Sequence, residues 1–456
     1  MNAQAKRRNS TPQRSDPRTR AVGILTRIEV DGAFLSQELA AEMGDPTLTD
    51  HDRSLLQKLV KGVLENRSYI DVVLAPCLAK GVDSLPPTVR GALRLGAYQI
   101  LFLDRVHAGT AVNASVEMAK RFGGAKFGNL VNAVLRRVLR EGASAAPGGT
   151  AIQRIAIEHS HPEWLVAHWV NEVGEAEAEE LCRFNNTPWP LFARVNTLKA
   201  AVADCRRALE NEGVSIRPGR WCEDVCIIES LPPGRKLDEL ESFRAGLFVI
   251  HDESSTMAAR LVEPRPGETV IDVCSAPGGK TVHLAALMGN HGRLLAYDPS
   301  PVRVKLVEEA CTRLGVSIVE TKVGGGERLT EELAADRVLV DAPCSGLGVV
   351  GRRPDIRWHR RPEKFEEFQS LQCGILRGAA RAVRVGGRLV YSTCTTSRVE
   401  NEGTVERFLV EHPHFDLVPV SSVVPPEART PEGFFRSWPQ RHRMGGAFGA
   451  ILERRR

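Results

Sequence analysis

The spacing of apolar residues divides the chain of 456 residues into parts with different folds. Between about residues 21 and 141, apolar residues recur every three or four positions, as in the run from Leu55 to Leu64, and no strand-like alternation appears. From Val262 onward, short apolar runs alternate with helical stretches of ten or more residues. The first pattern predicts an all-α bundle, and the second predicts an α/β domain with a doubly wound parallel sheet.

A linker and a mixed region lie between these two parts. Residues 142–149 form an Ala/Ser/Pro/Gly run, which marks a domain boundary. The region after it combines helical segments with short strand-like runs, so we expect a small α+β module there. The predicted parts are a basic disordered tail (1–20), an all-α domain (21–145), the α+β linking module (150–255) and the α/β domain (256–456).

Basic residues gather at the chain ends, although the net charge is only +5. The first twenty residues carry Asp16 as their one acidic side chain, and the chain ends in three arginines. Such tails hold phosphate backbones or are simply solvated, and the sequence leaves both interpretations open. The same choice applies to basic residues of the helical domain, such as Arg90, Arg94 and Arg137. The basic residues of the tail are Lys6, Arg7, Arg8, Arg14, Arg18 and Arg20.

The composition, 42% hydrophobic and 26% charged, is typical of a soluble globular protein. No apolar run is long enough to span a membrane or placed as a secretion signal, so we expect a cytoplasmic protein, and a monomer. Its ten cysteines are then mostly free thiols. Cys222 and Cys226 lack the second pair that a zinc site needs, so no metal is expected.

Two of the cysteines follow apolar runs that read as buried strands. The run Val338–Val340 ends in Asp341, with Cys344 three residues later, and the run Leu389–Tyr391 is followed closely by Cys394. The cysteines are 50 residues apart, about the length of one strand-helix-strand crossover and a loop. Both thiols are therefore expected at the carboxyl edge of the sheet, where open α/β sheets place their chemistry.

A glycine-containing loop follows the first strand of the same domain. Gly278 and Gly279 precede an apolar helix, and backbone amides at such a turn bind polar or anionic ligands. A Walker loop requires a glycine where Cys274 stands, which weakens the case for a nucleoside triphosphate. The next strand ends in Asp298, 19 residues after Gly279, where a carboxylate accepts hydrogen bonds from ribose hydroxyls. NAD and S-adenosylmethionine both fit these features.

The combined motifs resemble those of RNA cytosine-5 methyltransferases. They are Cys274-Ser-Ala-Pro-Gly-Gly-Lys280, Asp341-Ala-Pro-Cys344 and Ser392-Thr-Cys394. The helical domain, with Asn129-Leu-Val-Asn-Ala-Val-Leu-Arg136, is similar to the NusB-like domain of the RsmB (Sun/Fmu) family of 16S rRNA methyltransferases. The resemblance covers roughly residues 20 to 454.

This resemblance implies a Rossmann-like methyltransferase that uses S-adenosyl-L-methionine to methylate carbon 5 of a cytosine in 16S rRNA. It implies that Cys394 is the nucleophile that adds to carbon 6, that Cys344 assists release, and that Asp341 assists the addition. A tRNA methyltransferase and a non-catalytic RNA-binding or ribosome-assembly factor remain as alternatives. The implied cofactor residues are Cys274, Ser275, Ala276, Pro277, Gly278, Gly279, Lys280, Asp298 and Asp341.

The sequence departs from the family pattern at three places. Gly325 stands where the family usually has an aspartate that contacts adenine, and Glu327 is a possible substitute. His251 stands where the family usually has glutamine, and Met444-Gly-Gly-Ala-Phe448 replaces a more usual Met-Asp-Gly-Phe-Phe.

The basic segment from Gly351 to Trp358 is expected to hold RNA phosphates, with Trp358 stacking on a base.

Overall fold

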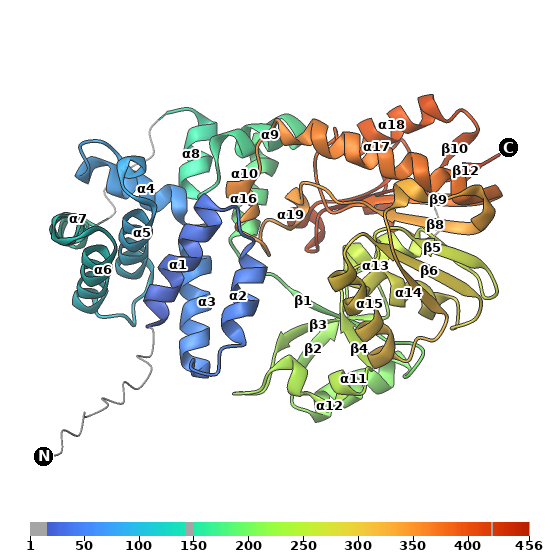
Figure 1. The fold of residues 1–456 in the computed structure, drawn as a ribbon, viewed down its shortest axis with the longest axis horizontal. Coiled ribbons are helices and arrows are strands. Elements are labelled where there is room, and N and C mark those ends of the chain that lie inside the picture. Colours follow the sequence, from blue (N-terminus) through green and yellow to red (C-terminus); the bar gives the residue numbers. More distant parts are fainter. Residues whose placement is uncertain (1–15, 143–148, 421–422, 456) are drawn as a thin grey trace, which may run out of the picture. The chain divides into compact units, whose positions relative to one another are not determined.

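The computed structural model describes residues 16–142, 149–420 and 423–455, and it divides into two compact units. Unit 1 comprises the residues up to Asn186 together with Arg353–His359, and unit 2 comprises Thr187–Arg352 and the residues from Arg360 onward. The predicted combination of an all-α domain, an α+β module and an α/β domain is confirmed (Figure 1). Residues 143–148 of the predicted linker and most of the predicted tail lie outside the described residues.

Unit 1 is entirely helical in its described residues. Buried residues of α1, α3, α5 and α7 share one apolar core, as the spacing of three and four predicts. No described helix, in either unit, has both the length and the hydropathy that a bilayer crossing requires. The helices of unit 1 are α1 (Pro17–Val30), α2 (Leu35–Met43), α3 (Asp50–Glu65), α4 (Arg67–Leu74), α5 (Pro87–Phe102), α6 (Ala108–Gly123), α7 (Ala125–Glu141), α8 (Ala151–Glu158), α9 (Glu163–Val173), α10 (Glu175–Asn185) and α16 (Ile356–His359).

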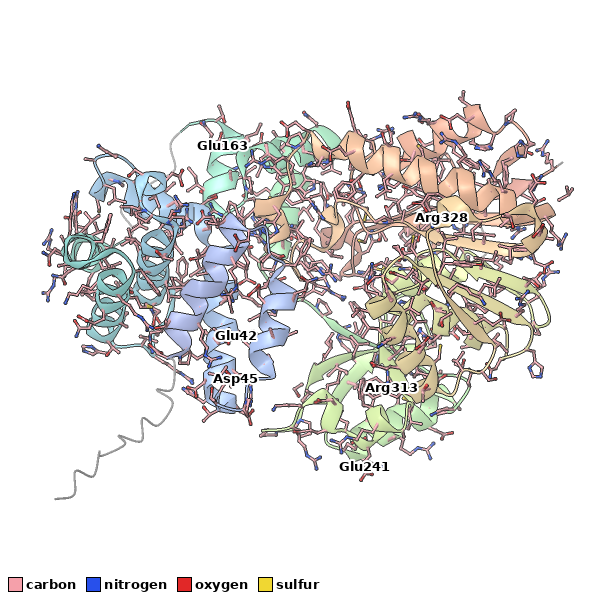
Figure 2. All side chains as sticks on the ribbon, in the orientation of Figure 1. Glu42, Asp45, Glu163, Glu241, Arg313 and Arg328 are labelled. Atoms are coloured by element: carbon pink, nitrogen blue, oxygen red, sulfur yellow. The ribbon has the colours of Figure 1, made fainter. Side chains whose placement is uncertain are left out.

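The first helix begins inside the segment predicted as a tail. Helix α1 starts at Pro17, where the side chain of Asp16 accepts a hydrogen bond from the amide of Arg18. Arg20 lies on this helix and forms ion pairs with Glu42 and Asp45, two residues that Figure 2 labels. Arg18 and Arg20 therefore belong to the folded domain, and their charges have partners within it.

Two arginines of the helical domain likewise form ion pairs inside the fold. Arg90 pairs with Glu29 at 3.1 Å, and Arg94, which is buried, pairs with Asp71 at 2.7 Å. Burial would raise the pKa of Glu29, but the arginines around it lower that pKa overall. For Arg90 and Arg94, ion pairing within the fold replaces both the RNA-contact and the solvated-face interpretations.

The segment Arg353–His359 is a folded part of unit 1. Arg357 is fully buried and donates a hydrogen bond to the carbonyl of Ser160 at 3.0 Å. The indole nitrogen of Trp358 donates to the carbonyl of Leu64 at 2.9 Å, and the ring packs against the helical core. The prediction that this segment holds RNA phosphates while Trp358 stacks on a base is therefore wrong for Arg357 and Trp358.

The α+β module of unit 2 has a four-stranded antiparallel sheet in the order β2-β3-β1-β4. Arg313, from the neighbouring α/β domain, donates to the carbonyls of Phe243 and Phe248 and so ties the module to that domain (Figure 2). The elements of the module are β1 (Leu191–Val195), α11 (Val202–Asn211), β2 (Ser215–Pro218), β3 (Val225–Ser230), α12 (Glu241–Arg244) and β4 (Phe248–Ile250).

The α/β domain is built on a mixed sheet, with the main path β10-β12-β9-β8-β5-β6-β7. Strands β9, β8, β5, β6 and β7 are parallel, whereas β12 runs antiparallel to β9, and β10 and β11 run antiparallel to β12. The alternation of strands and helices in the sequence predicted a parallel sheet, whereas the observed sheet is mixed. Its strands are β5 (Thr269–Asp272), β6 (Arg293–Asp298), β7 (Val319–Val323), β8 (Ala335–Asp341), β9 (Val383–Thr393), β10 (Phe415–Val418), β11 (Phe435–Ser437) and β12 (Ala447–Arg454).

Helices cover both faces of this sheet (Figure 1). Val338 and Val340 of β8 join the core that contains residues of α17, whereas Leu339 between them joins the core with α14 and α15. Neighbouring residues of a strand point to opposite faces, so a strand that is buried on both faces must be apolar at successive positions. The apolar run of β8 predicted the strand for this reason. The helices are α13 (Glu253–Arg260), α14 (Gly279–Leu287), α15 (Pro301–Leu314), α17 (Lys364–Ala382), α18 (Glu402–Glu411) and α19 (Pro439–His442).

Candidate active site

Two neighbouring parallel strands deliver the predicted cysteines to one edge of the sheet. Strand β8 ends at Asp341 and β9 ends at Thr393, and the two strands pair in register up to Asp341 and Ser392. The hydroxyl of Ser392 donates to Oδ1 of Asp341 at 2.8 Å, and the carbonyl of Ser392 accepts from the amide of Ala342 at 2.9 Å. The ladder therefore continues past the strand ends and fixes how both loops begin.

The thiols of Cys344 and Cys394 are in direct contact, with their sulfur atoms 3.3 Å apart. The hydrogen bond with Cys394 raises the pKa of Cys344, and burial raises it further. The protonated form of Cys344 is therefore favoured, and either sulfur can be the donor in this contact. The contact places the two predicted cysteines side by side at the edge of the sheet.

A lysine from the glycine loop lies beside the two cysteine loops. Nζ of Lys280 is 2.7 Å from Oδ2 of Asp341. Burial would lower the pKa of Lys280, but the Asp341 carboxylate and the sulfur of Cys394 raise it overall. Lys280 is thus a fixed positive charge, held by Asp341 and within electrostatic reach of Cys394.

Backbone contacts between glycines fix the loop that follows Cys344. The amide of Gly348 donates to the carbonyl of Cys394 at 3.0 Å, and the carbonyl of Gly348 accepts from the amide of Gly446 at 2.8 Å. A Cβ atom at position 348 would lie 2.0 Å from the carbonyl oxygen of Gly446. Only glycine permits this close packing of three chain segments.

Glu400 connects the two cysteine loops and was not predicted from the sequence. Its carboxylate accepts hydrogen bonds from the amide of Ser345 at 2.8 Å and from the hydroxyl of Thr395 at 3.4 Å. These residues directly follow Cys344 and Cys394. Glu400 is fully buried, and burial raises its pKa. It precedes α18 in a polar stretch of the kind that usually faces solvent, so the sequence carries no signal of its burial.

The glycine loop forms the start of α14, as predicted. Gly278 has φ +104° and caps the helix, a conformation that strongly favours glycine. Below the loop, Oδ2 of Asp272 accepts a hydrogen bond from Thr281 at 2.7 Å, whereas Oδ1 of Asp272 is buried and has no hydrogen-bond partner. Burial raises the pKa of Asp272 to about 7. An unpartnered buried carboxylate oxygen at this place is suited to a cationic ligand.

Asp298 lies at the end of β6, as its spacing from the loop predicted. Its Oδ1 accepts from the amide of Ser300 at 3.0 Å, and its Oδ2 lies 3.4 Å from Nη1 of Arg303. Arg303 also donates to the carbonyl of Ala276 at 2.8 Å. Arg303 therefore holds Asp298 and the glycine loop in a fixed relation.

Comparison with known proteins gives consistent matches along most of the chain. The profile described as 16S rRNA methyltransferase RsmB/F matches residues 259–453, the NusB family profile matches residues 15–140, and the ferredoxin-like domain profile of RsmF/B-like methyltransferases matches residues 161–233. A protein of Bacillus subtilis (strain 168) named "Probable ribosomal RNA small subunit methyltransferase B" is 37% identical, over 87% of this chain and 88% of the relative. The chain belongs to the ribosomal RNA small subunit methyltransferase B family.

Further relatives agree with this membership. Ribosomal RNA small subunit methyltransferase B of Serratia proteamaculans (strain 568) is 32% identical, over 82% of this chain and 85% of the relative. The crystal structure of the protein PH0851 matches with a TM-score of 0.81 and 30% identity, and covers 96% of this chain and 99% of that chain. The chain is therefore an RNA methyltransferase by family, with the fold of a solved structure along nearly its whole length.

Glu327 lies beside Gly325, at one of the departures from the family pattern. A Cβ atom at Gly325 would lie 2.1 Å from a carboxylate oxygen of Glu327, so Glu327 fills the space that a side chain at position 325 would take. Burial raises the pKa of Cys274, and the carboxylates of Asp298 and Glu327 are among the charges that raise it further. The Glu327 carboxylate thus belongs to the electrostatic surroundings of the glycine loop.

The other two departures each make a close contact with a neighbouring segment. His251 is buried against Gly279, where a Cβ atom would be 2.9 Å from the imidazole ring, and burial lowers the pKa of His251 well below its usual value. Gly445, in the place of the family's aspartate, donates its amide to Asp252 at 3.0 Å. A Cβ atom at Gly445 would lie 2.7 Å from Oγ of Ser254, so this contact depends on glycine.

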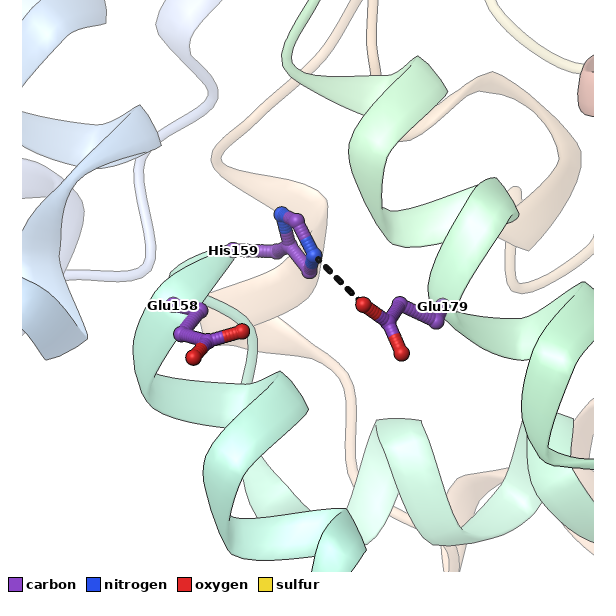
Figure 3. A group of neighbouring side chains, drawn as sticks. All are labelled: Glu158, His159 and Glu179. Carbon is purple, nitrogen blue, oxygen red and sulfur yellow. Dashed lines mark ion pairs between the residues drawn. The ribbon is translucent and has the colours of Figure 1, made fainter.

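A group of potential metal ligands lies elsewhere, in unit 1. Glu158, His159 and Glu179 place one ligand atom each within 4.8 Å of one another (Figure 3). Arg154 already pairs with Glu158 at 3.0 Å and with Glu179 at 2.9 Å. Arg183 lies 3.5 Å from Glu179 as well, so these side chains form a salt-bridge network with two arginines.

Proposed function

We propose that this protein transfers a methyl group from S-adenosylmethionine to carbon 5 of a cytosine in 16S rRNA through a covalent intermediate on Cys394. The single observation that carries this proposal is the 3.3 Å contact between Cys344 and Cys394 beside the Lys280–Asp341 ion pair. Carbon 5 of cytosine is a poor nucleophile, and a thiolate that adds to carbon 6 makes carbon 5 nucleophilic. One reactive thiol with a second thiol in contact fits this chemistry.

Each group at the sheet edge has a task in this reaction. The sulfur of Cys394 bonds to carbon 6, while Asp341 assists by hydrogen bonding to the ring, with the charged Lys280 as a proton donor beside it. After carbon 5 has taken the methyl group, it loses its proton to a base, and the bond between sulfur and carbon 6 breaks. Cys344 is in contact with the sulfur that leaves, so we assign it to this release step.

The residues present fit the cofactor. S-adenosylmethionine supplies the methyl group on a positively charged sulfonium. The loop Cys274–Lys280 offers backbone amides at the start of α14, and the unpartnered Oδ1 of Asp272 suits the cationic amino group of the methionine end. Asp298 takes the ribose hydroxyls, and Glu327 takes over the adenine contact that Gly325 lacks.

The names of the relatives support the choice of target class. The relatives above are named for ribosomal RNA of the small subunit, and the NusB family profile covers the helical domain. Both favour 16S rRNA over tRNA as the substrate. A non-catalytic assembly factor is less consistent with the chain, because Glu327 fills the space beside Gly325 and both cysteines are retained.

The experiment is a transfer assay with labelled S-adenosylmethionine on protein-free 16S rRNA and, in parallel, on bulk tRNA. We expect label only in 16S rRNA, recovered as 5-methylcytidine after digestion. Label in tRNA alone would keep the chemistry and overturn the substrate. Label at another base or another atom would overturn the role of Cys394, and absence of both label and cofactor binding would favour the assembly factor.

A further inference from the structure

The arginines that follow the Cys344 loop differ in what neutralises them. Arg352 pairs with the carboxylate of Asp252, and Arg357 is fully buried in unit 1. Arg352 is thus already neutralised by a carboxylate, and Arg357 is closed to a ligand. Arg360 is the next arginine after them in the sequence, and unit 2 resumes at this residue.

Arg360 is held in one orientation without being neutralised. Its Nε donates to the carbonyl of Ser345 at 2.8 Å, and its Cζ lies 4.9 Å from the ring centre of Phe368 on α17. Within the described part of the chain, no carboxylate lies within 4.0 Å of Arg360, and its two Nη groups make no hydrogen bond. Arg360 as a residue is half-buried and not enclosed, and its Nη groups are left for a ligand.

The position of this guanidinium relates it to the proposed reaction. Ser345, whose carbonyl it holds, directly follows Cys344, and Cys344 contacts Cys394. Stacking on Phe368 and the bond to Ser345 restrict the side chain before any ligand arrives, which lowers the entropic cost of binding. A planar guanidinium whose Nη1/Nη2 edge is free is suited to a phosphate group.

We propose that Arg360 binds a backbone phosphate of the RNA, next to the nucleotide whose base is methylated. This inference rests on the proposed function, since it requires RNA at the two cysteines. A target base has to leave its stack to reach such a site, and contacts to the flanking phosphates fix the position of the backbone while it does so. Arg360 is thus a substrate-binding residue that also positions the Cys344 loop.

The test compares three variants of the full chain with the parent protein. Arg360→Gln removes the charge. Arg360→Lys keeps the charge but replaces the planar guanidinium with an ammonium group. Arg381→Gln is the matched control. Arg381 is an exposed arginine near the far end of α17 and has no carboxylate partner among the described residues. Affinity for an unmodified 16S rRNA transcript is measured at several salt concentrations and constant Mg²⁺.

We expect Arg360→Gln to bind the transcript about 10- to 100-fold more weakly than the parent, as for loss of a charged hydrogen bond. The slope of log affinity against log salt should fall by about 0.7 to 1, the share of one phosphate contact. Arg360→Lys should keep the slope of the parent, and Arg381→Gln should keep both slope and affinity. Affinity for S-adenosylmethionine should be the same in all four proteins.

A purely structural role for Arg360 gives a different result. The Arg360→Gln protein would then turn over more slowly, with the salt slope of the parent, and this outcome overturns the inference while the proposed function stands. If the parent protein itself neither binds nor methylates the transcript, the proposed function fails and the inference fails with it.

Discussion

The sulfur atoms of Cys344 and Cys394 lie 3.3 Å apart, although 50 residues separate them in the chain. Their contact joins the ends of two neighbouring parallel strands, so it depends on the sheet and not on either loop alone. The hydrogen bond with Cys394 and burial both raise the pKa of Cys344, so two negative charges on this pair are disfavoured.

Removal of Cys344 should trap the enzyme on its RNA. Without the thiol that assists release, the Cys344→Ala protein should accumulate a covalent adduct with 16S rRNA in the presence of S-adenosylmethionine. The measurement is a retarded band on a denaturing gel. The double variant Cys344→Ala/Cys394→Ala should give no such band, and a band that persists in it would exclude Cys394 as the attacking residue.

Replacement of Glu400 should disturb both cysteine loops together. In the Glu400→Gln protein, one carboxylate oxygen becomes an amide that cannot accept from Ser345 or Thr395, which costs about 1–3 kcal/mol for each buried donor left unpaired. We expect kcat to fall at least tenfold, with unchanged affinity for S-adenosylmethionine by calorimetry. Glu411→Gln is the control, because Glu411 lies on the surface of α18 and pairs only with exposed arginines. Equal effects of the two substitutions would contradict the positioning role of Glu400.

A methyl group at position 348 should inactivate the protein. The Cβ of Gly348→Ala would lie 2.0 Å from the carbonyl oxygen of Gly446 and 2.8 Å from that of Cys394, and backbone atoms cannot give way as a flexible side chain can. We expect loss of methyl transfer and a lower melting temperature. Gly374→Ala on α17 meets nothing within 4 Å, and alanine favours helix, so this control should be neutral or stabilised by up to about 1 kcal/mol. Activity retained in Gly348→Ala would show that the loop can move.

Asp272 should make stability depend on pH. Its pKa is about 7 in the folded protein but about 3.9 in an unfolded chain, so between these values the unfolded state loses a proton that the folded state keeps. Stability contributed by this group is therefore present at low pH and is lost as pH rises toward 7. Relative to the parent, Asp272→Asn should gain about 3 kcal/mol in free energy of unfolding between about pH 5 and pH 8. Urea unfolding at both pH values measures this, and a constant difference between the two proteins would mean that Asp272 is ionised throughout.

The parallel strands could be located from the sequence because each is buried on both faces and therefore consists of an apolar run bounded by polar or glycine residues. The edge strand β7 (Val319–Val323) is less clearly marked in the sequence, because its side chains are exposed or half-buried. The antiparallel strands β10 and β12 were not predicted as such. Their place depends on pairing with β9, which no local pattern encodes.

The candidate site was predictable where its residues stand at strand ends, and Cys344, Cys394, Asp341 and Asp298 all lie there. The ion pair between Lys280 and Asp341 links two loops whose separation in the chain hides the contact. The burial of Glu400 is likewise a property of the tertiary fold.

The burial of Arg357 and Trp358 in unit 1 has a consequence for how the protein can be divided. A C-terminal fragment that begins at Thr187 would retain the segment Arg353–His359 but lose the carbonyls of Ser160 and Leu64, to which it is bonded. In this fragment the indole ring of Trp358 and the guanidinium of Arg357 would lose the surroundings that cover them in the whole chain. Both residues lie within ten residues of the end of the Cys344 loop, at Gly348. Conversely, an N-terminal fragment would lose the packing of Trp358 against its helical core. The two halves are therefore expected to be stable only when they are synthesised as one chain or expressed together.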